Sequence, residues 1–88
     1  MSARERAVHK EHRDAVRRVE RDLERETAEL RKLEGLLADP ELYATGGEEV
    51  GRAVRRHGEI RERVAALEAE WERAAERLAD LEAAQPQR

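Results

Sequence analysis

Two histidines and a glutamate near the start of the chain have the spacing of side chains that share one face of a helix. Glu5, His9 and His12 are separated by four and three residues, which brings their side chains together on a helix. Histidines at this spacing could bind a metal, but no third well-placed ligand supports them and the chain has no cysteine. The competing interpretation makes them polar residues of a helix–helix seam. We predict no metal and no cofactor, and keep metal binding through His9 and His12 as the weakest of three hypotheses.

The residues needed for covalent or acid–base catalysis do not form a recognisable set. The hydroxyl-bearing side chains are few, namely Ser2, Thr27, Tyr43 and Thr45. Carboxylates are plentiful, but a charged helix offers no pocket that would exclude water and shift their pKa values. The sequence therefore predicts a protein that is not an enzyme.

Basic side chains give the clearest pattern with a possible function. Arg17, Arg21 and Arg25 recur every four residues, which places them in a stripe on one helix face, and Arg18 extends it. The arginine guanidinium fits phosphate groups well. A solvated face without a ligand is the competing interpretation. No aromatic residue lies among these arginines, so stacking on nucleic-acid bases is not indicated.

A second basic cluster follows in the other half of the chain. It consists of Arg52, Arg55 and Arg56, and we expect it to lie beside Arg31 and Lys32 once the chain folds. An acidic stripe weakens the case for nucleic-acid binding. It contains Glu68, Glu72, Glu76 and Asp80. Nucleic-acid binding would therefore depend on local patches and not on the overall charge.

Composition indicates long helices and no compact globule. Of the 88 residues, 44% are charged and only 2% are aromatic, and the net charge is −3. Sparse apolar residues at regular intervals in such a background are typical of a coiled coil. No apolar run is long enough for a signal peptide or a membrane span, so we expect no membrane association and a cytoplasmic location.

Two tracts of seven-residue repeats define the expected helices. In each tract apolar residues alternate at intervals of three and four, which is the pattern of a left-handed coiled coil. The seam positions of the first tract are His9, His12, Val16, Val19, Leu23, Glu26, Leu30, Leu33 and Leu37. Those of the second are Val50, Ala53, His57, Ile60, Val64, Leu67, Trp71, Ala74, Leu78 and Leu81.

A short segment rich in turn residues separates the tracts. Pro40 must end the first helix, and Asp39 before it suits the N-cap of a short helical turn. Capping boxes are expected at Ser2–Glu5 and at Thr45–Glu48. We predict an all-α fold, a single antiparallel two-helix coiled-coil hairpin over residues 1–88. Its first helix spans about 3–38, its turn 39–47 and its second helix about 48–84.

One antiparallel register fits the seam positions best, because it sets large residues against small ones. In this register the numbers of facing residues add to 90, as for Leu23 with Leu67 and Val19 with Trp71. We expect Trp71 to be a core residue. The expected weak layers are Leu33 opposite His57 and Glu26 opposite Val64, where the Glu26 carboxylate reaches toward water.

Three segments of the chain resemble the C-terminal coiled-coil domain of ABC-F ATPases, the translation-associated soluble relatives of transporter ATPases. The segments are Lys10-Glu11-His12-Arg13, Leu37-Ala38-Asp39-Pro40-Glu41-Leu42-Tyr43 and Glu70-Trp71-Glu72. The resemblance implies a hairpin that helps a parent ATPase to contact nucleic acid or the ribosome. The ATP-binding domains of that family have no counterpart among these residues.

The leading hypothesis is therefore a non-catalytic accessory hairpin that contributes to DNA, RNA or ribosome binding, with ABC-F ATPase domains as a further partner. The alternative is a structural coiled coil that pairs with itself or with another protein and does not bind nucleic acid. The candidate nucleic-acid-binding residues are Lys10, Arg13, Arg17, Arg18, Arg21, Arg25, Arg31, Lys32, Arg52, Arg55 and Arg56.

Overall fold

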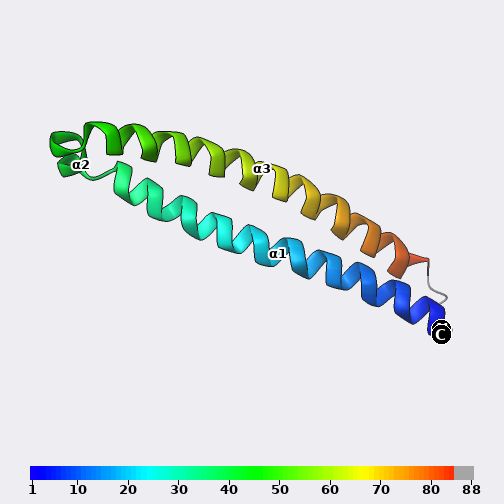
Figure 1. Cartoon of the computed structure of the whole chain (residues 1–88). Helices are drawn as coiled ribbons and strands as arrows, with labels where there is room; N and C mark the ends of the chain where they lie inside the picture. Colours follow the sequence, from blue (N-terminus) through cyan, green and yellow to red (C-terminus); the bar gives the residue numbers. More distant parts are fainter. Residues whose placement is uncertain (85–88) are drawn as a thin grey trace.

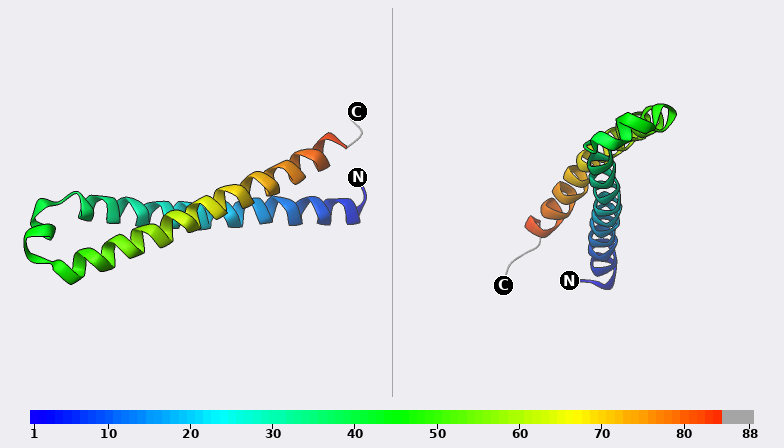
Figure 2. Two further views of the ribbon diagram at one scale, coloured as in Figure 1. Left: turned by 90° about the horizontal axis from the view of Figure 1, so that it is seen from above. Right: turned by 90° about the vertical axis from the view of Figure 1, so that its left-hand side faces the viewer.

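The computed structural model describes residues 1–84 and contains three helices. Helix α1 spans Ala3–Leu37, α2 spans Pro40–Thr45 and α3 spans Gly47–Ala83. No strand occurs in this part of the chain, so the fold is all-α as predicted. The two long helices with α2 between them form a rough hairpin in which α3 runs back along α1 (Figure 1). Figure 2 shows the two long helices crossing at an angle.

The molecule is a rod of 65 × 17 × 16 Å. The start of α1 and the end of α3 lie at one end of the rod, and α2 closes the other end (Figure 1). We call the α2 end the tip. Among the described residues, no helix is both long and apolar enough to cross a membrane.

The first turn of α1 is fixed by the predicted capping box. The Glu5 backbone N–H donates to the Ser2 hydroxyl at 3.1 Å, and the Ser2 N–H donates to the Glu5 carboxylate at 3.4 Å. These bonds satisfy two of the amide groups that a helix N-terminus leaves without partners. The helix therefore begins at the predicted residue.

The tip contains a short helix, α2, in place of an irregular turn. The Asp39 carboxylate accepts a hydrogen bond from the Glu41 N–H at 3.0 Å, and Pro40 occupies the first helical position of α2. Leu42 is buried and closes the tip end of the seam. Tyr43, which follows it, points outward and is 57% exposed.

The capping box predicted at Thr45–Glu48 is wrong. Thr45 is the last residue of α2, and its hydroxyl donates to the Glu41 carbonyl at 3.0 Å. The N-cap of α3 is Gly46, which has no side chain to offer. Glu48 and Glu49 in the first turn instead place negative charge where the helix dipole favours it.

The core is a narrow strip along the facing sides of α1 and α3. Its buried apolar residues are Val19, Leu42, Ala53, Ile60, Val64 and Ala74. All except Leu42 occupy the predicted seam positions, and Ile60 is fully buried. Most of the seam leucines are only half-buried, as expected when two helices bury a single stripe each.

Three polar contacts between the long helices report their register. Trp71 lies against Glu20, Arg63 against Glu26 and His57 against Glu34. The residue numbers of these pairs add to 91, 89 and 91, on either side of the predicted 90. In each pair the carboxylate belongs to α1 and the nitrogen to α3.

Candidate nucleic-acid interface

The side of α1 that faces away from α3 is strongly basic. In the seven-residue repeat, with positions a and d in the seam, positions b, c and f point outward. Within α1 these positions hold three acidic residues and eight basic ones. The basic residues, which we call the basic face, are Arg4, Lys10, Arg17, Arg18, Arg21, Arg25, Arg31 and Lys32. All eight are exposed.

The outward side of α3 carries the opposite charge. Its b, c and f positions hold three basic residues and six acidic ones. The hairpin fold thus separates charges that nearly cancel in the whole chain, leaving about +5 on the back of α1 and about −3 on the back of α3. A local field of this kind acts on charged partners even when the net charge is small.

The centre of the basic face holds three arginines that have no ion-pair partner among residues 1–84. In the part of the chain that the structure describes, Arg17, Arg18 and Arg21 make no ion pair. Like charges at four-residue spacing destabilise a helix by a few tenths of a kcal/mol per pair. Neither an ion pair nor packing therefore explains why these three arginines stand together.

Two members of the basic face do have acidic partners. Lys10 Nζ lies 2.6 Å from Asp14 Oδ2, and Arg25 Nη2 lies 2.9 Å from Asp22 Oδ1. The hydrogen bond from Lys10 is the main cause that lowers the pKa of Asp14. Desolvation opposes it, and the positive charges of Lys10, Arg17 and Arg13 each add a smaller lowering effect. Asp14 therefore senses the field of the basic face.

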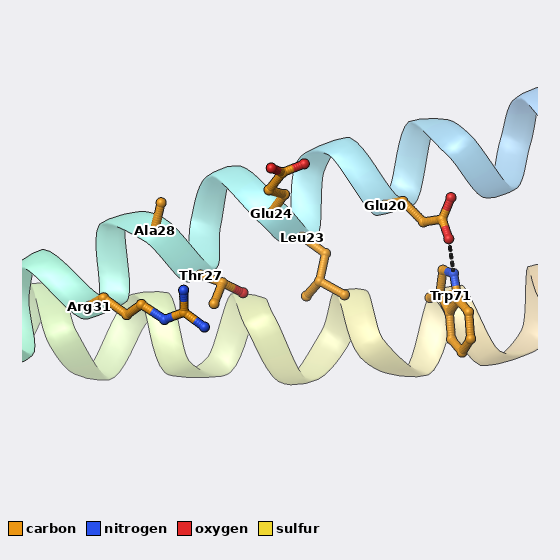
Figure 3. A pocket seen from close by; sticks show the side chains of 7 residues that line it. All are labelled: Glu20, Leu23, Glu24, Thr27, Ala28, Arg31 and Trp71. Carbon is orange, nitrogen blue, oxygen red and sulfur yellow. Dashed lines mark hydrogen bonds between the residues drawn. The ribbon is translucent and has the colours of Figure 1, made fainter.

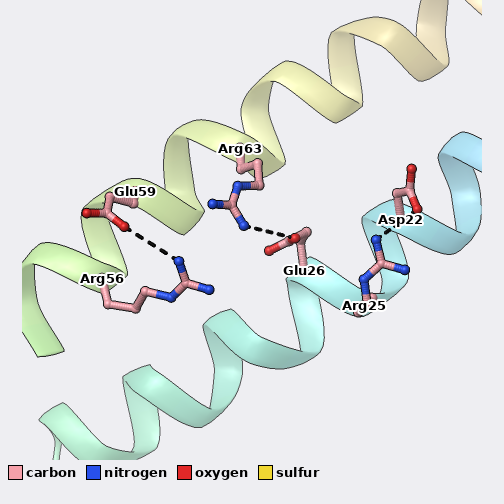
Figure 4. A network of polar contacts seen from close by, with 6 residues as sticks. All are labelled: Asp22, Arg25, Glu26, Arg56, Glu59 and Arg63. Atoms are coloured by element: carbon pink, nitrogen blue, oxygen red, sulfur yellow. Dashed lines mark hydrogen bonds and ion pairs between the residues drawn. The ribbon is translucent and has the colours of Figure 1, made fainter.

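The second basic cluster, Arg52, Arg55 and Arg56 on α3, meets the basic face of α1 at Arg56. Arg52 pairs with Glu48 at 3.7 Å and Arg56 with Glu59 at 3.5 Å, both within α3. Arg56 also lines an open groove together with Arg25, Glu26 and Glu29. Figure 4 shows Arg56 on α3 with Glu59, and Arg25 and Glu26 on α1. Arg55 is exposed.

The structure does not bring Arg31 and Arg56 into one groove. Arg31 lines a groove with Trp71, whereas Arg56 lines the groove beside Arg25. These grooves lie on opposite sides of the seam, because Arg31 is at a b position and Arg56 at a g position of the repeat. Lys32, at a c position, is on the same side as Arg56. Arg13 is exposed at an e position, beside the basic face.

The seam contains an ion pair that spacing alone did not reveal. Arg63 Nη1 donates to Glu26 Oε1 at 3.1 Å, and the Glu26 side chain is only 14% exposed (Figure 4). The sequence placed Glu26 in a weak layer facing water. The sequence contained the information needed to predict this pair. In the predicted register, Arg63 lies beside the seam and opposite Glu26.

Trp71 lies at the edge of the seam and not in its centre. Its indole N–H donates to Glu20 Oε2 at 3.1 Å, and the side chain is half-buried (Figure 3). The ring borders an open groove of about 540 Å³. The other lining residues come from α1 and are Glu20, Leu23, Glu24, Thr27, Ala28 and Arg31.

The histidines near the start of α1 have no further metal ligand arranged beside them among residues 1–84. His9 is buried, and in residues 1–84 no group of three or more histidine, cysteine, aspartate or glutamate side chains is arranged to hold a metal. The histidine hypothesis is therefore not carried further.

Comparison with known proteins finds no match: no family model, no curated protein and no solved structure shows significant similarity to the chain. The resemblance to the ABC-F C-terminal domain stays a prediction.

Proposed function

We propose that this chain is an antiparallel coiled-coil hairpin that binds nucleic acid through the basic face of α1. The observation that carries the proposal is the group Arg17, Arg18 and Arg21, which makes no ion pair among residues 1–84 and lies at the centre of a face with eight basic and three acidic residues. A group of exposed like charges is expected where a ligand of opposite charge supplies the missing partner.

The chemistry of the face favours the phosphate backbone as the ligand. Arginine and lysine neutralise phosphates and release their counterions, and this effect does not depend on base sequence. Lys10 and Lys32 are 22 residues apart, which is about 33 Å along a helix at 1.5 Å per residue. That length matches one turn of duplex, about 34 Å. The proposed ligand is thus DNA or RNA, including structured RNA of the kind found in ribosomes, bound without sequence preference.

The proposed role is non-catalytic. A hairpin of this kind would act as an accessory module, and the resemblance to the ABC-F C-terminal domain makes a parent ATPase the first partner to test. The shape supports such a role, since the two long helices begin and end together at one end of a 65 Å rod. A neighbouring protein domain attached at that end would present the basic face at a distance from its own surface.

The test is a binding titration at two salt concentrations with variants of equal charge. The first variant replaces Arg17, Arg21 and Arg25 by glutamine, and its matched control replaces Arg61, Arg73 and Arg77. All six are exposed, and glutamine keeps the helix propensity of arginine. Binding to fluorescent duplex DNA and duplex RNA is followed by anisotropy, and circular dichroism checks that both variants stay helical.

The proposal predicts that only the first variant loses affinity strongly. If three phosphate contacts are lost, the slope of log K against log salt becomes shallower by up to about 2.7 for duplex DNA. The control keeps a slope close to that of the unchanged chain. Equal losses in the two variants would show that overall charge alone matters, and absence of binding by the unchanged chain at low salt would overturn the proposal.

A further inference from the structure

Helix α3 has two unlike flanks beside its seam. On the flank formed by positions c and g of the repeat, nine of ten residues between 49 and 80 are charged. On the flank formed by positions b and e, only four of ten residues between 51 and 82 are charged. The uncharged ones are Gly51, Val54, Gly58, Ala65, Ala75 and Ala79. We call the b and e side, which includes the groove of Trp71, the Trp71 flank.

The Trp71 flank has an apolar groove and an exposed aliphatic side chain. The ring of Trp71 and the side chains of Leu23, Thr27 and Ala28 border the groove, so apolar atoms dominate its wall (Figure 3). Nearer the tip on the same flank, Val54 is 52% exposed. The opposite flank instead carries the polar network of Asp22, Arg25, Glu26, Arg56, Glu59 and Arg63 (Figure 4).

The accessible surface of the chain leaves room for a large interface. The chain exposes 6838 Å², whereas a compact monomer of 10.1 kDa is expected to expose about 5,300 Å². The excess of about 1,500 Å² per chain exceeds the roughly 800 Å² that each partner buries in a standard interface. Packing two such rods along one flank would remove part of this excess.

The charges of the Trp71 flank are complementary between the two helices. On α1 the b and e positions hold five basic and three acidic residues, and on α3 they hold one basic and three acidic residues. The two strips therefore carry about +2 and −2. If α1 of one copy packs on α3 of a second copy, the positive strip of each α1 faces the negative strip of the other copy's α3. This contact occurs twice in the pair.

We propose that a second copy of this chain covers the Trp71 flank and forms a two-fold symmetric four-helix bundle. In a two-fold interface the same surface serves both partners, so each favourable contact occurs twice. The apolar groove around Trp71 lies near the centre of the interface, and the complementary charges lie at its rim. This dimer goes beyond the proposed nucleic-acid binding. Lys10, Arg17 and Arg31 of the basic face lie at b positions, on the rim of this interface, whereas the c and f positions of Arg18, Arg21 and Arg25 point away from this flank and stay open to solvent.

Two neighbouring alanines provide a matched test. Ala65 lies on the Trp71 flank and Ala66 on the opposite flank, and both are exposed. Ala65→Arg and Ala66→Arg add the same charge and bulk one residue apart, and arginine is a good helix former. Sedimentation equilibrium of the full chain measures mass, and circular dichroism confirms that each variant is folded. Val54→Arg provides a second variant on the Trp71 flank.

The proposal predicts twice the chain mass of 10.1 kDa for the unchanged chain and for Ala66→Arg, and a single chain mass for Ala65→Arg and Val54→Arg. A single-chain mass for the unchanged chain at about 100 μM, a concentration at which even a weak dimer of Kd ~10 μM is mostly formed, would overturn it. Dissociation by Ala66→Arg as complete as by Ala65→Arg would also overturn it, as would dimers in all variants. None of these outcomes affects the salt-dependent binding test of the basic face.

Discussion

Arg63 donates a hydrogen bond to Glu26 across the seam at 3.1 Å, joining residues that are 37 positions apart in the chain. Glu26 occupies a seam position and is 14% exposed, whereas Arg63 lies beside the seam and is 48% exposed. The two partners are therefore unequal: the carboxylate depends on the guanidinium, but the guanidinium can be solvated without it.

This inequality predicts opposite effects for the two residues. Glu26→Leu should raise the free energy of unfolding by about 1 kcal/mol, because an apolar side chain replaces a mostly buried charge. Arg63→Gln should lower it by about 1 kcal/mol, because the Glu26 carboxylate loses its cation. Urea unfolding followed by circular dichroism at one fixed protein concentration measures both. A loss of stability in Glu26→Leu would show that the ion pair contributes more than apolar packing can replace.

Trp71 provides a second prediction through its bond to Glu20. Glu20 is exposed, so its carboxylate returns to water when the indole is removed, and Trp71→Phe should lower the free energy of unfolding by only about 1 kcal/mol. Trp71→Ala, which also deletes the ring, should cost about 2–3 kcal/mol. The exchange rate of the indole N–H, measured by NMR, should rise in Glu20→Ala and not in Glu20→Gln. Unchanged exchange in Glu20→Ala would contradict the hydrogen bond.

Two glycines with different surroundings predict different responses to alanine. Nothing lies within 4 Å of a Cβ built at Gly58, which is in the middle of α3. Gly58→Ala should therefore stabilise the chain by up to about 1 kcal/mol through helix propensity. A Cβ at Gly46 would lie 3.1 Å from the Leu42 carbonyl oxygen, so Gly46→Ala should give no such gain. Thermal unfolding at low protein concentration measures the stability of both variants. An equal increase in stability in Gly58→Ala and Gly46→Ala would contradict the close contact between position 46 and the Leu42 carbonyl.

The pKa of Asp14 gives a prediction about the field of the basic face. The hydrogen bond from Lys10, aided by the positive charges of Lys10, Arg17 and Arg13, holds the pKa of Asp14 below its ordinary value. A lowered folded-state pKa stabilises the fold above the ordinary value, and this contribution is lost as the pH falls through the folded-state pKa. Carbon-detected NMR titration should show the pKa rising in Lys10→Gln and, by a smaller amount, in Arg17→Gln. No change in either variant would contradict the proposed field.

The sequence was sufficient to predict the order of the long helices and both ends of α1. Ser2 and Glu5 defined the start of α1, and Asp39 with Pro40 defined its end, because capping and proline geometry are local effects. The cap of α3 was missed because α2 extends through Thr45, whose hydroxyl then bonds to Glu41 and is no longer available. That outcome depends on the length of α2, which the spacing of residues did not fix.

The candidate surface was predicted less completely than the helices. The sequence placed Arg17, Arg21 and Arg25 in one stripe, but it did not show that Arg25 pairs with Asp22 while the other two arginines have no acidic partner among residues 1–84. The position of Trp71 at the seam edge also required the structure. The seven-residue repeat predicts the direction in which each side chain points. The final position of the Trp71 ring depends also on its size and on its hydrogen bond to Glu20.

The hairpin contacts and the Trp71 flank depend on one antiparallel register, and a cross-linking experiment tests it most directly. The contacts Glu20–Trp71 and Glu26–Arg63 place Leu23 opposite Leu67. Because the chain has no cysteine, the double variant Leu23→Cys with Leu67→Cys can be compared with Leu30→Cys with Leu67→Cys, in which the pair is displaced by one repeat of about 10 Å. We predict rapid formation of an intramolecular disulfide under mild oxidation in the first variant and none in the second. Preferential closure of the second variant would contradict the register and the surfaces that depend on it.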